Sequence, residues 1–333
     1  MTLDLVTGGA GFIGSHLVEA LLKAGRRVRV VDNFTTGRRA NLASFADNPL
    51  LEVIEADIAA PGVLDPVLAG VDRVFHLAAL ADIVPSIQQP EAYFRANVDG
   101  TFALCQAALK AGVKRFVYTA SSSCYGIPEQ YPTPETTPID CRYPYALTKN
   151  LGEQIALHWA RVYKLPVIAL RLFNVYGPRS RTSGTYGAVF GVFLAQLLAS
   201  KPLTVVGDGT QTRDFTYVGD VVQAFLAAAA SDRSGEVYNV GTGAAVSVNR
   251  LVELLGAKEI VHLPKRPGEP DCTLADVRRI RADLGWSSRV PLEEGVRIML
   301  DNIDYWREAP VWTPDTIAEA TVDWFKNLND PKT

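Results

Sequence analysis

Cysteine is scarce in this sequence, and no hydrophobic run in it is long. The cysteines are Cys105, Cys124, Cys141 and Cys272. Because they lie far apart and form no Cys-x-x-Cys pair, we expect neither a zinc site nor a disulfide framework, and we infer reduced thiols in a cytoplasmic protein. The apolar stretches at 188–199 and 221–230 fall short of the roughly 18–20 residues that span a bilayer. Neither a metal nor a membrane is therefore predicted as a partner.

An excess of positive charge is also missing. Lysine and arginine number 33 against 36 for aspartate and glutamate, so the net charge is −3 at pH 7, and no basic stripe is present. Nucleic acid is therefore not an expected partner. In contrast, 48% of the 333 residues are hydrophobic, with aromatic and β-branched residues throughout. This composition predicts a large folded core rather than disorder.

The first half of the chain alternates short apolar runs with helical patterns. Runs rich in Val, Ile and Phe predict strands at 3–6, 28–31, 51–55, 74–77, 116–119 and 167–171. Helical patterns lie between them, at 15–24, 63–69, 91–111 and 147–163. The strands are apolar on both faces, as in a parallel sheet covered by helices. We therefore predict an α/β fold, a Rossmann-like doubly wound parallel sheet, over residues 1–175.

Glycine and proline become frequent after residue 176. Helical patterns follow at 193–199, 221–230 and 248–255, and strand candidates at 203–206, 236–240 and 259–262. This pattern predicts a smaller C-terminal α+β region for the substrate over residues 176–330, interleaved with the first part.

A glycine-rich loop joins the first predicted strand to the first helix. Its three spaced glycines are Gly8, Gly11 and Gly14. Such glycines permit a tight turn and a close approach to a pyrophosphate, which then faces the free N–H groups of the helix. Asp32 ends the second strand, where a carboxylate binds both ribose hydroxyls of NAD and repels the 2′-phosphate of NADP. NAD is the predicted cofactor, and Arg38 and Arg39 leave NADP open as an alternative.

A second motif provides groups for acid–base chemistry. Tyr145 and Lys149 are four residues apart at the start of a helix and so share one face. A cation beside a phenol is expected to lower the pKa of the phenol and make it a usable base. Ser121, Ser122 and Ser123 follow the strand at 116–119, which places hydroxyls at the carboxyl edge of the sheet.

With these motifs the sequence resembles the extended short-chain dehydrogenases/reductases that act on nucleotide sugars. The resemblance runs through nearly the whole chain. Its further motifs lie at 76–79, 97, 171–178, 207–215, 238–241 and 266–269. It implies Tyr145 as the base, Lys149 on the nicotinamide ribose, and a hydroxyl on the sugar 4-hydroxyl, with Ser121 the first choice and Ser122 the second.

The resemblance also implies the rest of the site. Further expected cofactor-binding residues are Phe12, Ile13, Asn33, Asp57, Ile58, Leu77, Ala78, Ala79 and Asn97. For Asp57, a contact with adenine and a solvated turn are both open. Expected substrate-binding residues are Ser123, Asn174, Ala188, Val189, Arg213, Arg266 and Thr273. Arg213 and Arg266, each in a glycine-rich loop, suit bidentate contacts with a diphosphate, although surface arginines in solvated loops are the alternative.

The serine run favours one reaction within the resembled family. Relatives that eliminate water or carbon dioxide tend to carry Glu just before the Tyr-Gly pair, where this chain has Ser122 and Ser123. Serine is a poor base at pH 7, so we predict a 4-epimerase with recycled NAD. Thr273 leaves room for an acetamido group, which favours UDP-GlcNAc/UDP-GalNAc as well as, or over, UDP-glucose/UDP-galactose.

Other functions stay open. A 4,6-dehydratase or decarboxylase could take its acid from elsewhere, for example Glu135. Gly191 and the charged stretch 179–181 keep UDP-glucuronate or a GDP-sugar open as substrate. An NAD-sensing regulator is the non-enzymatic alternative. Relatives pair the two helices at 97–111 and 147–163 into a four-helix bundle, so a homodimer is expected.

Overall fold

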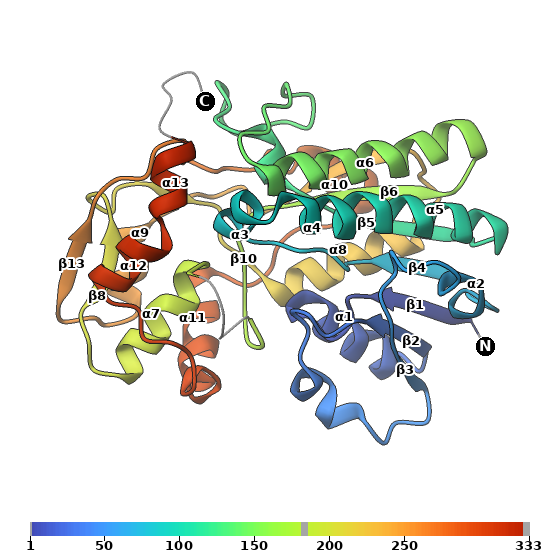
Figure 1. Cartoon of the computed structure of the whole chain (residues 1–333), viewed down its shortest axis with the longest axis horizontal. Helices are drawn as coiled ribbons and strands as arrows, with labels where there is room; N and C mark the ends of the chain where they lie inside the picture. Colours follow the sequence, from blue (N-terminus) through green and yellow to red (C-terminus); the bar gives the residue numbers. More distant parts are fainter. Residues whose placement is uncertain (1, 181–185, 329–333) are drawn as a thin grey trace.

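A seven-stranded parallel sheet runs through the centre of the computed structural model, which describes residues 2–180 and 186–328 (Figure 1). Its order is β11-β6-β5-β4-β1-β2-β3. The strands are β1 (Leu3–Thr7), β2 (Arg27–Asp32), β3 (Leu51–Glu55), β4 (Arg73–His76), β5 (Arg115–Ser121), β6 (Val167–Leu172) and β11 (Glu236–Val240). The Rossmann-like doubly wound sheet is thus confirmed.

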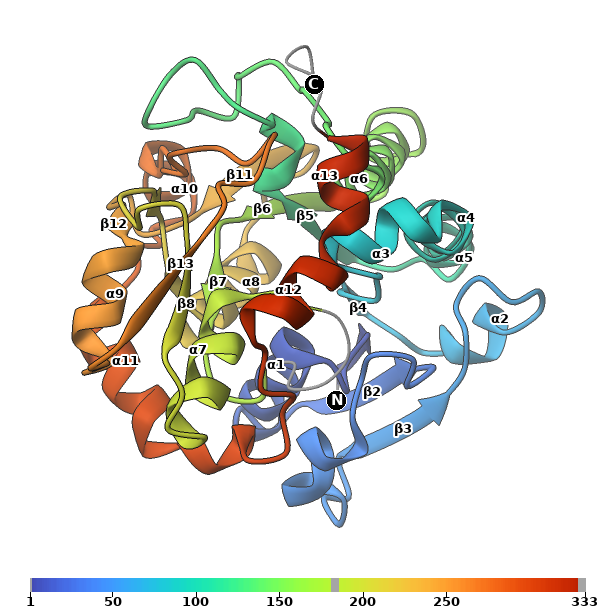
Figure 2. The same ribbon diagram turned by 60° about the vertical axis from the view of Figure 1, so that its left-hand side comes forward.

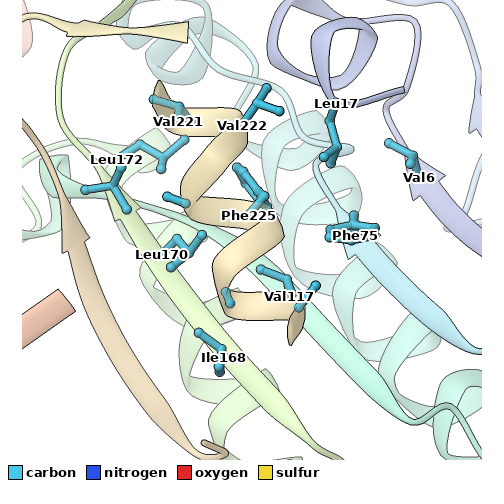
Figure 3. Close-up of a cluster of buried hydrophobic side chains, with 14 of the residues drawn as sticks. Val6, Leu17, Phe75, Val117, Ile168, Leu170, Leu172, Val221, Val222 and Phe225 are labelled. Carbon is cyan, nitrogen blue, oxygen red and sulfur yellow. The ribbon is translucent and has the colours of Figure 1, made fainter. Parts of the chain in front are cut away.

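Helices cover both faces of this sheet. The helices α1 (Phe12–Lys23) and α8 (Val218–Ala230) share one hydrophobic core with it, and α5 (Gly100–Lys110) and α6 (Pro144–Tyr163) share the other. In Figure 3, Phe225 of α8 points to the strands. Because apolar side chains fill both faces, polar ligands can reach the sheet only at an edge.

Two elements differ from the expected pattern. The strand at 236–240, expected in the smaller region, is β11 and pairs with β6 in the central sheet. The helical pattern at 91–111 is divided into α4 (Pro90–Phe94), a turn of π-helix η2 (Arg95–Asp99), and α5. Asn97 lies in that turn and hydrogen-bonds the backbone of Leu80 through its side chain. Such tertiary contacts leave no trace in hydrophobic periodicity.

The remaining elements are short. Three two-stranded sheets pair β7 (Val175–Tyr176) with β10 (Thr216–Tyr217), β9 (Thr212–Arg213) with β12 (Val246–Ser247), and β8 (Leu203–Val206) with β13 (Ile260–Leu263). Additional helical segments are η1 (Arg39–Phe45), α2 (Leu64–Val67), α3 (Ile83–Gln88), η3 (Ser122–Tyr125), α7 (Val189–Leu198), α9 (Val248–Leu254), α10 (Arg278–Leu284), α11 (Leu292–Asp301), η4 (Ile303–Trp306), α12 (Pro314–Ala320) and α13 (Val322–Asn327). The C-terminal helix α13 packs against α3 of the first half (Figure 2). Within the described ranges, no helix combines the length and the apolar composition that a membrane crossing requires.

A buried ion pair joins α6 to β6. Arg171 donates from Nε and from one Nη to the two carboxylate oxygens of Glu153, at 2.9 and 2.5 Å. Both side chains are less than a tenth exposed. The other Nη of Arg171 donates to the Tyr125 hydroxyl at 2.8 Å, and that hydroxyl donates to Asn239 of β11 at 2.7 Å. The network therefore fixes the helix of the expected catalytic tyrosine to two strands.

We predict that Glu153→Gln destabilises the protein by about 3–5 kcal/mol, because Arg171 would stay buried without its counter-charge. Urea unfolding followed by circular dichroism measures this loss. The exposed pair Lys110–Asp65 provides the control, and Lys110→Gln should change the unfolding free energy by less than about 1 kcal/mol. A loss below about 1 kcal/mol for Glu153→Gln would contradict the assignment.

Candidate active site

A cavity of about 620 Å³ opens at the carboxyl edge of the sheet. Its lining includes most of the expected site residues: Gly8, Gly11, Phe12, Ile13, Gly14, Asp32, Asn33, Asp57, Ile58, Leu77, Ala78, Ala79, Ser121, Ser122, Ser123, Tyr145, Lys149, Asn174, Ala188, Arg213 and Thr273. Asn97, Val189 and Arg266 are not in its lining. The cavity thus unites the glycine loop, the serine run and the Tyr-Lys pair.

The glycine loop is packed too closely for side chains. A Cβ at Gly14 would lie 2.2 Å from the carbonyl oxygen of Gly8. At Gly8, where φ is +68°, a Cβ would lie 2.6 Å from the backbone nitrogen of Ala78. The bare backbone at the start of α1 therefore leaves space for a pyrophosphate against N–H groups, and these residues fit a dinucleotide.

Asp32 presents a buried carboxylate at the end of β2. It accepts hydrogen bonds from the backbone N–H groups of Phe34 at 2.8 Å and Ala10 at 3.0 Å. Burial raises the pKa of Asp32, and these two bonds oppose that rise. Arg39, a residue that left NADP open, instead pairs with Glu55. The arrangement fits the ribose hydroxyls of NAD.

Two of the expected cofactor residues form hydrogen bonds or ion pairs within the chain. Asp57 lines the cavity, but its oxygens accept from Arg95 at 2.8 Å and from the N–H of Ala59 at 2.9 Å. Asn97 is buried behind the cavity wall and donates to Thr148 of α6 and to the carbonyl of Leu80, each at 3.0 Å. The structure thus places Asn97 as a link between the wall and α6.

Hydroxyl groups meet at the end of β5. The Tyr145 hydroxyl lies 3.4 Å from Ser121 Oγ, and Ser121 Oγ lies 2.7 Å from Ser123 Oγ. Of the two serines considered for the sugar 4-hydroxyl, Ser121 is the one within hydrogen-bonding distance of Tyr145. A 4-hydroxyl bound here would face both a base and a second hydroxyl.

The expected lowering of the Tyr145 pKa is wrong for the protein without ligands. Burial raises the pKa of Tyr145, the bond with Ser121 lowers it, and the charge of Asp82 raises it further. The ammonium of Lys149 lies over the ring of Tyr118, 4.6 Å from its centre. Burial lowers the pKa of Lys149 to about 7, although the nearby Glu153 opposes that shift. Desolvation is the largest influence on both groups, and spacing along a helix does not report it.

Three of the expected substrate residues in the lining are Asn174, Arg213 and Thr273. Thr273 donates to the side-chain oxygen of Asn174 at 2.6 Å. Arg213 donates to Glu269 at 2.8 Å, and Arg266 lies 3.8 Å from the same carboxylate. Of the stretch 179–181, residue 181 lies outside the described residues.

Some cavity-lining residues were missed by sequence reasoning. They include Asp82, Tyr143, Trp312 and Trp324. Tyr143 precedes Tyr145 by two residues, so its position next to the motif could have indicated it. Trp312 and Trp324 belong to the C-terminal segment, and only the folded chain places that segment beside the motifs.

Comparison with known proteins agrees with this geometry. Residues 5–241 match the model of the NAD dependent epimerase/dehydratase family. A UDP-glucose 4-epimerase of Mycolicibacterium smegmatis is 38% identical over 88% of this chain and 95% of its own. UDP-glucuronic acid decarboxylase 1 of Arabidopsis thaliana is 35% identical over 90% of this chain and 69% of its own.

A solved structure of a similar enzyme has the same fold. The dTDP-glucose 4,6-dehydratase of Streptomyces venezuelae, which has NAD bound, superposes with a TM-score of 0.85 at 31% identity, covering 92% of this chain and 99% of that one. The names of these similar proteins all contain a nucleotide sugar, but they state different reactions. The chain belongs to the NAD-dependent epimerase/dehydratase family.

Proposed function

We propose that this enzyme is an NAD-dependent nucleotide-sugar 4-epimerase that acts on UDP-GlcNAc/UDP-GalNAc, on UDP-glucose/UDP-galactose, or on both pairs. The observation that carries the proposal is the hydroxyl cluster at the end of β5. Tyr145 lies beside Ser121, and Ser122 and Ser123 occupy the places where relatives that eliminate water or carbon dioxide tend to carry an acid. The cluster can move a proton on and off one hydroxyl.

Each residue then has a definite role in the reaction. When bound, NAD supplies the acceptor for the hydride of C4 and gives it back. Tyr145 as phenolate takes the proton of the 4-hydroxyl and later returns it, while Ser121 orients that oxygen. Arg213 and Arg266 hold the diphosphate while the ketosugar turns, so that binding energy from the nucleotide retains the intermediate without fixing the ring.

The position of Glu135 also supports epimerisation. Glu135 is not among the residues that line the cavity. Its carboxylate accepts from the backbone N–H of Asn239 at 2.8 Å, and its carbonyl oxygen accepts from Arg171 at 3.2 Å. Glu135 therefore belongs to the hydrogen-bond network of Arg171 and Asn239. An elimination reaction would need another acid.

Asp82 supports a second candidate function. It lines the cavity at the start of α3, and its charge raises the pKa of Tyr145. A carboxylate near the reacting carbon is what a 4,6-dehydratase or decarboxylase requires, with UDP-glucuronate or a GDP-sugar among its substrates. The two candidates differ in whether the product keeps the formula of the substrate.

Thr273 favours a substrate range that includes acetamido sugars. Its side chain is small, lines the cavity and bonds Asn174. A larger aromatic side chain there would fill the space that an acetamido group needs. The site therefore suits both acetamido sugars and plain hexoses.

We further propose a homodimer in which α5 and α6 of two copies form a four-helix bundle. Large apolar side chains on these helices are exposed: Phe102, Leu109, Leu147, Val162 and Tyr163. Exposed apolar side chains on neighbouring helices favour burial against another protein surface. A second copy, which presents the same face, fits the family's arrangement.

The reaction itself is tested by an NMR time course. UDP-GlcNAc, UDP-glucose, UDP-glucuronate and a GDP-sugar are each incubated with the purified enzyme without added NAD. We expect the C4 epimer of a UDP-hexose or UDP-acetamidohexose, and we expect Tyr145→Phe to lower kcat by about 10²- to 10⁴-fold because the base is lost. Release of water or carbon dioxide would overturn the epimerase and favour the lyase.

Asp82→Asn separates the two candidates by pH dependence. The active form of Tyr145 is deprotonated, so kcat/KM rises with pH up to the pKa of that tyrosine. Since the Asp82 charge raises this pKa, removing the charge should move the rising limb to lower pH and preserve epimerisation. If Asp82 were the acid of an elimination, turnover would instead fall by about 10²- to 10⁴-fold. Asp65→Asn, in a surface ion pair, is the control and should leave the profile unchanged.

Light scattering tests the assembly. Val162→Asp should shift the mass at micromolar concentration from dimer toward monomer, because a charge would be buried inside the four-helix bundle that the two copies form. Ile260→Asp changes a similarly exposed residue on β13 and should leave the mass of the dimer unchanged. A wild-type mass equal to one chain would contradict the dimer.

A further inference from the structure

The C-terminal helix α13 closes one end of the active-site cavity. Trp324 on this helix is only 6% exposed and forms an apolar cluster with Val84 of α3 and with Leu328. Tyr143, next to the catalytic motif, packs against the same cluster. Asp323 accepts from the side chain of Gln88 at 2.7 Å, which joins α13 to α3 a second time. Figure 2 shows α13 beside α3.

Trp324 also contacts the loop that carries Arg266. The guanidinium of Arg266 lies 5.4 Å from the centre of the Trp324 ring and 4.7 Å from that of Tyr186. The indole N–H of Trp324 donates to the carbonyl of Pro267 at 2.8 Å. The Trp324 side chain therefore contacts both the guanidinium of Arg266 and the backbone of Pro267, the residue that follows it.

These contacts restrict the freedom of an otherwise flexible side chain. An aromatic face attracts a guanidinium without using its N–H groups. One Nη of Arg266 donates to the Tyr186 hydroxyl, and the contact with the Trp324 ring occupies none of the others. An arginine that is already ordered loses less entropy when it binds a diphosphate. The Glu269 carboxylate lies 3.8 Å from Arg266 and accepts from Arg213 at 2.8 Å, so it keeps the two guanidinium groups close together.

We propose that Trp324 is a positioning residue of the nucleotide-sugar site, which acts by holding Arg266 in place for the substrate diphosphate. The C-terminal helix thus belongs to the substrate site, although it is far in sequence from every motif. This inference rests on the proposed function, in which Arg266 contacts the diphosphate.

Isothermal titration of the NAD-containing holoenzyme with UDP and with uridine tests the inference without need of a reaction. Trp324→Ala should weaken UDP binding about tenfold and leave uridine binding unchanged, since only UDP carries the diphosphate. In an Arg266→Gln background, Trp324→Ala should have no further effect on UDP. Trp324→Phe, which retains an aromatic face but loses the indole N–H, should lose less affinity than Trp324→Ala.

Trp286→Phe is the matched control. Trp286 is buried away from the cavity and donates its N–H to the carbonyl of Asp220 at 3.0 Å, so this variant removes the same kind of bond and should leave UDP affinity unchanged. Equal losses for UDP and uridine, an undiminished effect in the Arg266→Gln background, or UDP affinity within twofold of wild type would overturn the inference. If Trp324→Ala does not fold, the other two variants decide. The inference is overturned if both Trp324→Phe and Arg266→Gln bind UDP with the affinity of the wild type. Failure of the wild-type holoenzyme to bind UDP would instead overturn the UDP-sugar function itself.

Discussion

The parallel pairing of β1, β4, β5 and β6 is the constraint on which the site depends. Parallel strands bring their carboxyl ends to one edge, and the helices on both faces leave that edge as the approach for a polar ligand. The glycine loop follows β1 and the serine run ends β5. The glycine loop and the serine run therefore meet in space although they lie more than 100 residues apart in the chain.

Helix α6 connects this edge to the interior. Tyr145, Lys149 and Glu153 follow at intervals of four residues and so lie along one face, from the cavity to the buried ion pair with Arg171. Burial raises the pKa of Tyr145 and lowers that of Lys149 to about 7, so the packing around them disfavours the charged form of both groups. Glu153 counteracts this at Lys149.

Local sequence signals predicted the sheet and the cofactor end well. The strands of the first half, the loop around Gly14 and the position of Asp32 follow from apolar runs and turn chemistry, which are local properties. The place of β11 in the central sheet, the π-turn around Asn97 and the contact of Trp324 with Arg266 depend on pairs of segments far apart in the chain. Desolvation of Tyr145 is likewise a property of the packed interior, which spacing along one helix does not report.

The division of the cavity explains how one fold serves several reactions. The proposed cofactor end is formed by backbone that tolerates no side chain at Gly8 and Gly14. At the proposed nucleotide end, Arg213 lines the cavity and bonds Glu269, and Arg266 lies behind the lining against Tyr186 and Trp324. Between these ends, the proposed position of the reacting sugar is bordered by exchangeable side chains around Ser121. Replacing a hydroxyl by a carboxylate at that point would add an acid for elimination and leave both binding ends intact. Overall similarity therefore identifies the family and the cofactor, whereas the reaction is determined by the groups within hydrogen-bonding reach of Tyr145.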